Sequence, residues 1–342
     1  MRPALLVFGY ALAVAWLAPP LLARLTARGI SARLGLAAWL TAMASAVASA
    51  IAALQFLIQA AITGWPNLAE AVCRSVTGSA CAPTVYKSAA FEVGLAAAAL
   101  LGTLTAAVLS WRYGRSVQRA RRRTRAHAEL ARIAGRSLPG EVSGAMSGPL
   151  SGALSGAGSA MVLDAEQPVA YCVPGRPAAI VLSSGALAVL DPAQLTAVLA
   201  HERAHLAGRH HLLTGLTRAL SACFPAVPLF TRGAEEVARL AEMRADDAAV
   251  RRSGRPTLIA ALLAMGTGTA VPAAALGMPA AALGAATCAV ASRVQRLLDP
   301  PDRGLLVRYG LALAGVTLLL VLASVILAGY AAPLATHALA LL

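Results

Sequence analysis

Four long apolar stretches, each free of charged residues, alternate with short basic clusters along the chain. A helix that crosses a bilayer takes about 20 predominantly apolar residues. The stretches that approach or exceed this length are Leu5–Leu22, Leu36–Ile62, Val93–Trp111 and Tyr309–Leu342. We therefore predict a mainly α integral membrane protein with four transmembrane helices.

Pro19-Pro20 lie near the end of the first stretch, where we expect them to break its helix. Its apolar run is too long for a cleaved signal peptide, and a second span follows soon after it. We interpret it as a span that the protein retains.

Between the third and fourth spans the apolar pattern becomes shorter and changes its period. Residues 143–159 repeat Ser-Gly about every four positions, a composition typical of a flexible linker. Two β-prone runs follow, Ala170–Val173 and Ala178–Ser183, with a turn signal at Pro174-Gly175 between them. They predict a hairpin or an edge pair, so we expect an α+β domain here.

A strong helix start comes next. Asp191 is a capping residue, Pro192 suits the first helical position, and Gln194 stands where a capping box requires Glu or Gln. Apolar positions at helical spacing continue as far as Leu220, which predicts one unbroken helix. The bend "SACFPAVPLFTRG", apolar enough to reach the membrane face, then leads to a second helix that ends before Gly254.

Residues 256–292 carry no charge and pose the question of a fifth span. Glycine and proline interrupt them repeatedly, so we expect a short amphipathic helix over about 257–265 followed by a loop. The predicted division of the chain is a three-span region over 1–111 with a loop over 63–88, a basic segment and linker over 112–160, an α+β domain over 161–304, and a fourth span with a short tail over 305–342.

Composition supports the membrane interpretation. The chain is 58% hydrophobic, with a mean hydropathy of +0.69, whereas an ordinary soluble domain is about 45–50% apolar. The net charge of +14 would suit a nucleic-acid partner, but the arginines cluster beside the apolar stretches. We therefore expect contact with the lipid bilayer and no direct contact with nucleic acid.

The arginine clusters also predict an orientation, because short cytoplasmic loops hold the positive excess. Residues 24–34 and 112–308 are expected on the cytoplasmic side. The loop over 63–88 and both termini are expected outside, in a multi-pass protein of the plasma (inner) membrane.

Residues 201–205 form the motif His-Glu-x-x-His inside the predicted helix. Two imidazoles four residues apart lie on one helical face, where both can bind one metal ion. Glu202 stands beside them, within reach of a water on that metal. The sequence therefore predicts one zinc ion per chain, with His201 and His205 as ligands and Glu202 as general base. A chance match on a solvated helix would not require the strong cap and apolar run that precede it.

The third ligand has two candidates. Gly208 and His211 extend the motif to H-E-x-x-H-x-x-G-x-x-H. In proteins with this pattern the helix ends at the glycine, and the third histidine, here His211, turns back to bind the metal. In an unbroken helix, however, His211 lies about 9 Å further along the axis than His205, too far for a bond near 2 Å. Glu242 and Asp246, four residues apart on the second helix, are the alternative, with Glu242 as ligand and Asp246 bracing a histidine.

The strings "LDPAQLTAVLAHERAHLAGRHH", "AEMRADDAAV" and "RVQRLLDPP" together resemble the BlaR/MecR-type bacterial membrane metallopeptidases, in particular their shorter, sensor-less members. The resemblance covers about residues 162–300 and the spans around them. It implies a gluzincin-type zinc protease domain inserted between the third and fourth spans. It also implies zinc held by His201, His205 and the Glu of an E-x-x-x-D motif, here Glu242 with Asp246. The HtpX/Ste24-like peptidases share that motif and are an open alternative.

The expected activity is peptide-bond hydrolysis at the cytoplasmic face by a membrane-embedded zinc metalloendopeptidase. The resemblance implies regulatory cleavage of a cytoplasmic transcriptional repressor; quality control of membrane proteins and a non-catalytic receptor or scaffold are alternatives. The strand over Ala178–Ser183 is expected to align an extended substrate along its edge. His210, His211 and Arg293 are candidates for contact with the substrate or its oxyanion. The signalling relatives carry a sensor domain after the last span, so antibiotic sensing by this chain alone is not expected.

The five cysteines divide between the two sides of the predicted topology. Cys73 and Cys81 both lie in the loop over 63–88, where an oxidising compartment favours a disulfide between them. The other three are expected to be buried small apolar residues; they are Cys172, Cys223 and Cys288.

This topology predicts the outcome of thiol labelling in intact cells. A membrane-impermeant maleimide should label Cys73 and Cys81 only after reduction, because the pair lies outside and is oxidised. Cys172 should stay unlabelled in both conditions, as mass spectrometry of the digested protein can check. Labelling of Cys172 before the cells are permeabilised would invert the topology.

Overall fold

The computed structural model describes residues 2–27, 31–64, 89–134, 136–137, 159–173, 178–267 and 290–340. Its longest helices are α1 (Arg2–Thr26), α2 (Ala32–Gly64), α4 (Ala89–Ala134) and α13 (Arg303–Ala340). Each contains a segment long and apolar enough to cross a membrane; these are Ala4–Thr26, Ala32–Ala61, Val93–Arg119 and Gly304–Ile326. The prediction of four candidate membrane helices is confirmed, whereas the type of membrane and the orientation stay predictions.

The expected break in the first span is wrong, because Pro19 and Pro20 lie inside α1 and the helix continues to Thr26. Proline removes a backbone hydrogen bond, but a neighbouring packed helix can hold the chain on its helical path. Leu22, which follows the prolines, is fully buried in a core that α1 shares with α2. This packing outweighs the local cost of the prolines.

A four-stranded sheet precedes the helix that carries His-Glu-x-x-His. Its strands are β1 (Arg136–Ser137), β2 (Ser159–Leu163), β3 (Ala170–Val173) and β4 (Ala179–Ser183), in the order β1-β2-β4-β3. The two predicted strands are confirmed, and they pair antiparallel. The expectation that Ala178–Ser183 is an edge is wrong, because β2 pairs in parallel with the other side of β4. Every residue of β4 is buried, as suits a central strand, and β3 is an edge strand of the sheet.

The sequence pattern did not predict β2, nor the two-residue strand β1 that pairs with it. The linker expected over 143–159 ends one residue too late, since Ser159 already begins the strand. The rest of that linker lies outside the described residues. The sheet therefore contains a parallel pair as well as the predicted antiparallel one.

α7 (Ser184–Val189) and α8 (Pro192–Ala207) follow β4 directly. The predicted capping box of α8 is confirmed. The Asp191 carboxylate accepts from the Gln194 backbone N–H at 2.8 Å, and the Gln194 side chain accepts from the Asp191 N–H at 3.2 Å. Two of the free N–H groups at the start of α8 are thereby satisfied.

The unbroken helix expected as far as Leu220 is wrong. α8 ends at Ala207, Gly208 caps it, and Arg209 adopts a left-handed conformation with φ of 48°. A new helix, α9 (His210–Cys223), begins immediately after this turn. The break places His210 Nδ1 3.0 Å from His205 Nδ1.

α10 (Pro228–Ser253) follows the predicted bend and ends, as expected, before Gly254, whose φ of 83° favours glycine. α11 (Arg255–Thr267) covers the short helix expected over 257–265. The loop expected after it lies outside the described residues, and a further short helix covers 290–298.

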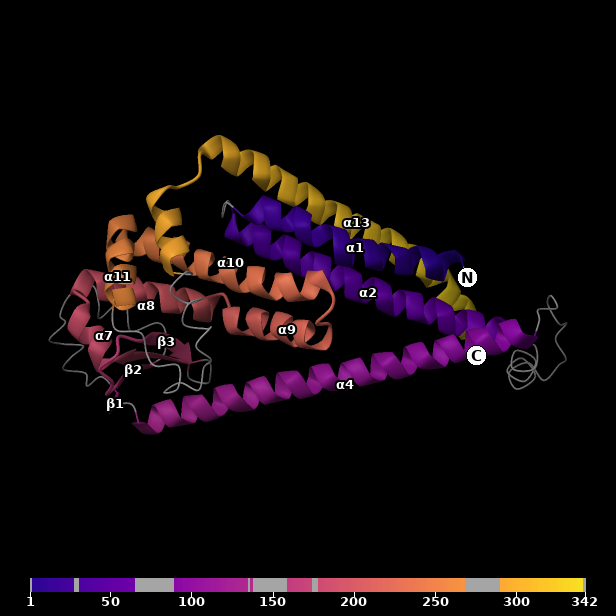
Figure 1. Cartoon of the computed structure of the whole chain (residues 1–342), viewed down its shortest axis with the longest axis horizontal. Coiled ribbons are helices and arrows are strands. Elements are labelled where there is room, and N and C mark those ends of the chain that lie inside the picture. Colours follow the sequence, from indigo (N-terminus) through magenta and orange to yellow (C-terminus); the bar gives the residue numbers. More distant parts are fainter. Residues whose placement is uncertain are drawn as a thin grey trace.

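α10 connects α8, which carries the His-Glu-x-x-His motif, to the long apolar helices. One face contributes Val237, Leu240 and Met243 to the core that contains Trp39 of α2. In Figure 1, α9 and α10 lie between α2 and α4, whereas the sheet, α7, α8 and α11 gather at one end of the molecule. The residues around the metal centre and the apolar helices therefore share one packed structure.

Gly185 of α7 provides a test of this packing. Its N–H donates to the Ala165 carbonyl at 2.9 Å, and an added Cβ would lie 1.9 Å from the Glu166 carbonyl oxygen. Gly185→Ala should therefore displace the segment that leads into β3 and destabilise the fold by about 1–3 kcal/mol. Gly215→Ala is the matched control, since nothing lies near its Cβ position. Thermal unfolding in detergent should show a lower midpoint for Gly185→Ala alone; equal midpoints would contradict the packing.

Candidate metal centre

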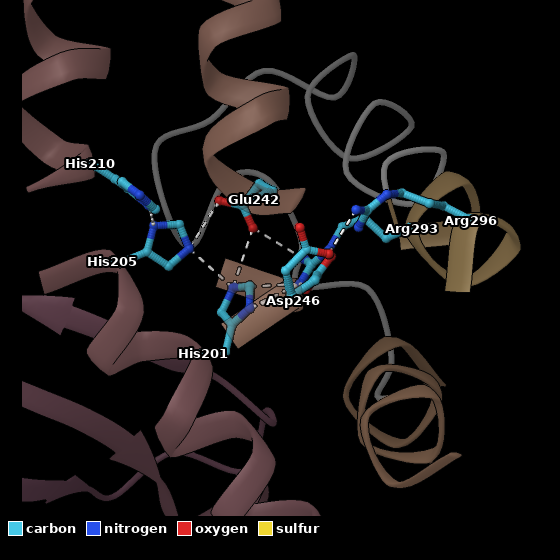
Figure 2. Close-up of polar contacts among 8 residues, drawn as sticks. His201, His205, His210, Glu242, Asp246, Arg293 and Arg296 are labelled. Atoms are coloured by element: carbon cyan, nitrogen blue, oxygen red, sulfur yellow. Dashed lines mark hydrogen bonds and ion pairs between the residues drawn. The ribbon is translucent and has the colours of Figure 1, made fainter. Parts of the chain in front are cut away.

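α8 and α10 bring three metal-binding side chains together (Figure 2). His201 and His205 lie one turn apart on α8, with their Nε2 atoms 3.1 Å apart. Glu242 of α10 places Oε2 3.4 Å from His201 Nε2 and Oε1 3.4 Å from His205 Nε2. In the described part of the chain, these residues form a candidate metal-binding group.

The spacing of the three side chains fits zinc. Ligands at 2.0–2.1 Å from a tetrahedral centre are about 3.3–3.4 Å from one another. The two histidine Nε2 atoms lie 3.1 Å apart, and each lies 3.4 Å from one oxygen of the Glu242 carboxylate. Two imidazoles and one carboxylate also form a donor set of catalytic zinc sites, which keep a fourth position for water or substrate.

Asp246, one turn after Glu242 on α10, holds His201 from its other ring nitrogen. Its side chain is fully buried, and Oδ1 lies 3.1 Å from His201 Nδ1. When Nε2 binds a metal, Nδ1 carries the proton and donates it to this carboxylate. The geometry is that of the brace expected from the E-x-x-x-D spacing.

Arg293, from the helix over 290–298, neutralises both acidic residues. Its Nε donates to Asp246 Oδ2 at 2.9 Å, and its Nη1 lies 3.3 Å from Glu242 Oε2. A guanidinium in this position suits two neighbouring carboxylates, because its donors form a fixed fork. Arg293 was expected near the substrate, and it lines the cavity as well as pairing with these acids.

The pKa values follow from these contacts. Burial alone would lower the pKa of His201, but hydrogen bonds to Asp246 and Glu242 raise it to about 9. Burial would raise the pKa of Asp246, but His201 and Arg293 hold it below its ordinary value. The pKa of Glu242 is lowered in the same way, by hydrogen bonds from His201 and His205. The carboxylates therefore stay ionised and favour a cation between the two histidines.

His205 has a histidine partner of its own. His210 is almost fully buried, and its Nδ1 lies 3.0 Å from His205 Nδ1 (Figure 2). Burial lowers the pKa of His210 to about 4, so its neutral ring can accept the proton of His205 Nδ1. His210 thus orients His205 with Nε2 toward Glu242.

Gly208 makes this arrangement possible. An added Cβ at Gly208 would lie 2.3 Å from His210 Nε2, so only glycine lets the ring fold back over the end of α8. α8 therefore ends with Gly208 as its cap, as the H-x-x-G-x-x-H pattern requires. The turn that follows brings His210, and not His211, next to His205. His211 is not part of the candidate metal-binding group among the described residues.

Glu202 lies on α8 between the two histidines and is buried at 9% exposure. Burial raises its pKa, although His201 and His205 oppose the shift. Cys172, on the edge strand β3, lines the same cavity as Glu202. Burial raises the pKa of the Cys172 thiol to about 12, and the nearby Glu202 carboxylate adds to the shift. The expectation that Cys172 is a buried apolar residue is wrong, because it is partly exposed and lines the cavity together with the expected general base. Cys223 is buried, as expected.

A cavity of about 420 Å³ opens beside the metal centre. Ala170, Tyr171 and Cys172 of β3 line one side of it, with His201, Glu202, His205 and Glu242 at its polar end. The remaining wall is apolar and comes mainly from α11, including Leu262 and Met265. An extended chain along β3 would therefore pass the metal centre with an apolar pocket beside it.

The comparison with known families bears on this site. Residues 154–239 match the family described as Peptidase family M48. This segment is similar to that family. No curated protein and no solved structure matches the chain. The M48 match includes His201, Glu202 and His205 but ends three residues before Glu242, whose assignment therefore depends on the geometry.

The M48 similarity and the four apolar helices together suggest a membrane-associated metallopeptidase. The BlaR/MecR-type assignment is finer than this match and stays a prediction, as does the division into domains. The expected Cys73–Cys81 disulfide and Cys288 lie outside the described residues.

The contact between His210 and His205 predicts an effect on metal affinity. His210→Ala should weaken zinc binding by about 10–100-fold, because His205 loses the group that orients it. Gly208→Ala should weaken binding as well, since the methyl group displaces His210. Competition with a chelator of known affinity would measure both. His211→Ala is the control and should bind zinc like the wild type; the reverse order of effects would contradict the geometry.

Proposed function

We propose that this protein is a membrane-bound zinc metalloendopeptidase. The observation that carries the proposal is the convergence of His201, His205 and Glu242 into one group that can hold a metal ion. This group lies beside a cavity that Glu202, the proposed general base, also lines. The M48 similarity over 154–239 supports the same chemistry independently. A non-catalytic receptor or scaffold would not need this complete set of groups.

A zinc ion held by these ligands would polarise the scissile carbonyl and lower the pKa of an attacking water. Glu202 takes the proton from that water and later passes it to the leaving amine. The raised pKa of Glu202 suits this role, because a carboxylate whose pKa is closer to neutral pH can both take a proton in the first step and give it up in the second.

We propose that the substrate lies along β3. β3 is an edge strand of the sheet, and it lines the cavity next to Glu202. An extended peptide added to this edge gains main-chain hydrogen bonds, and its side chains alternate toward and away from the cavity. Leu262 and Met265 favour an apolar substrate side chain near the cleaved bond.

Of the three candidates for contact with the substrate or its oxyanion, Arg293 lines the cavity and His210 is buried behind His205. We therefore propose Arg293 as the cation near the developing negative charge. Its two carboxylate partners limit its movement, so it is held at the rim of the metal centre before substrate arrives.

The identity of the substrate rests on the sequence resemblance. We propose regulatory cleavage of a cytoplasmic repressor-like protein at the inner face of the plasma membrane. Quality control of membrane proteins is the second candidate, since the centre is packed directly against the apolar helices through α10.

Substitutions separate metal binding from catalysis. Glu202→Gln should retain one zinc ion per chain and lose proteolysis of an unfolded protein such as casein, because the amide cannot accept the proton. Glu242→Ala should lose both zinc and activity, because it removes a ligand. Metal analysis of the purified variants, beside His211→Ala as control, checks both. Loss of zinc from Glu202→Gln would reassign its role, and retention of tight zinc by Glu242→Ala would refute the third ligand.

A further inference from the structure

The hairpin formed by α9 and α10 packs against two membrane helices at its tip. Cys223, at the end of α9, donates its thiol to the Leu109 carbonyl of α4 at 3.9 Å. Leu109 belongs to the candidate span Val93–Arg119. On the other side, Phe230 of α10 is buried in one core with Trp39 and Met43 of the span Ala32–Ala61. The tip therefore lies between α2 and α4, as Figure 1 shows.

Charge follows the same arrangement. Residues 219–231, "ALSACFPAVPLFT", contain no charged residue, and Arg218 and Arg232 flank them on the two helices. Both arginines are exposed. On α4, the first charged residue after Leu109 is Arg112, one turn further toward the sheet, and it is also exposed. Three helices thus change from uncharged to basic at a similar level.

The exposed positions at the tip are compatible with lipid. Pro225 and Ala226 are exposed and apolar, while Leu229 and Phe230 are buried against the spans. Arginines that flank an apolar segment can keep their stems in the apolar layer and extend their guanidinium groups to the headgroups. If the uncharged tip were exposed to water instead, the position of an arginine at each of its ends would have no such explanation.

We propose that the tip of the α9–α10 hairpin, residues 219–231, is inserted in the lipid bilayer beside the four spans. Arg218, Arg232 and Arg112 lie at the headgroup level. The partner of this surface is the acyl-chain region of the bilayer, and the hairpin enters and leaves on the same side as the metal centre.

The insertion sets the height of the metal centre. His210 lies eight residues before Arg218 on α9, which corresponds to about 12 Å along a helix. Glu242 lies ten residues after Arg232 on α10, which corresponds to about 15 Å. The two helices run side by side and give similar values, so the metal centre is held about 12–15 Å above the headgroup level.

Spin labels on single cysteines test both parts of this proposal. The full chain, with its native cysteines replaced by alanine, would be reconstituted in phosphatidylcholine–phosphatidylglycerol vesicles. Ala226→Cys reports on the tip and Leu212→Cys on the start of α9, near the metal centre. Val108→Cys on the exposed face of α4 is the lipid control, and Val189→Cys at the end of α7 is the water control.

Collision with oxygen, which concentrates in lipid, is compared with collision with a water-soluble nickel chelate. The label at residue 226 should favour oxygen, as at 108, and the label at residue 212 should favour the nickel chelate, as at 189. A label at 226 that behaves like 189 would overturn the insertion. A label at 212 that behaves like 108 would overturn the height.

A second measurement uses the wild-type chain, in case the cysteine-free protein does not fold. Vesicles would contain phosphatidylcholine with a photoactivatable group at the end of an acyl chain. Adducts should form on the peptide with residues 219–231 as well as on α4. Adducts on α4 without any on 219–231 would overturn the proposal. Both experiments measure lipid contact and not hydrolysis, so their outcome is independent of the proposed function.

Discussion

The carboxylate of Asp246 is fully buried, and the structure around the metal centre depends on its neutralisation. A buried charge has to be paired, and removal of one partner from a buried pair typically costs about 3–5 kcal/mol. Asp246 finds its partners in His201 of α8 and Arg293 of the helix over 290–298. Three elements that are distant in sequence are thereby held in one orientation. Glu242, one turn earlier on α10, then faces the Nε2 atoms of both histidines.

α10 transmits this constraint to the rest of the protein. Leu240 and Met243 pack against α1 and α2, whereas Glu242 and Asp246 face α8 from another side of the same helix. Arg239 of α10 donates to the carbonyl of Thr26, the last residue of α1, at 2.9 Å and pairs with Glu236. A shift of α10 relative to α2 would therefore move a proposed metal ligand. The metal centre and the spans form one mechanical unit through this helix.

The sequence allowed the regular elements to be predicted, because their determinants are local. The four apolar helices follow from uncharged runs of sufficient length, and the start of α8 follows from Asp191, Pro192 and Gln194. The convergence of Glu242 and Asp246 on His201 agrees with an E-x-x-x-D spacing read between apolar neighbours. The helices and the cap required no knowledge of contacts between distant segments, whereas the Glu242 and Asp246 prediction rested on the family resemblance.

The features that were not predicted depend on tertiary contacts. Leucines at helical spacing continue past residue 208, so the break before α9 is explained only by the contact of His210 with His205 and the space at Gly208. Cys172 lines the same cavity as Glu202 because β3 is an edge strand beside α8, and that order depends on β2. The uninterrupted apolar run of β4 was a signal for a central strand, and a strand on its other side could have been sought from it.

X-ray absorption at the zinc edge of the purified protein tests the central claim most directly. The account predicts nitrogen and oxygen neighbours at about 2.0–2.1 Å, with the multiple scattering of two imidazoles. In Glu242→Ala, any residual zinc should lose an oxygen neighbour while both imidazoles remain. A sulfur neighbour near 2.3 Å, which would come from a cysteine such as Cys172, or the scattering of three imidazoles, would contradict the assignment of His201, His205 and Glu242.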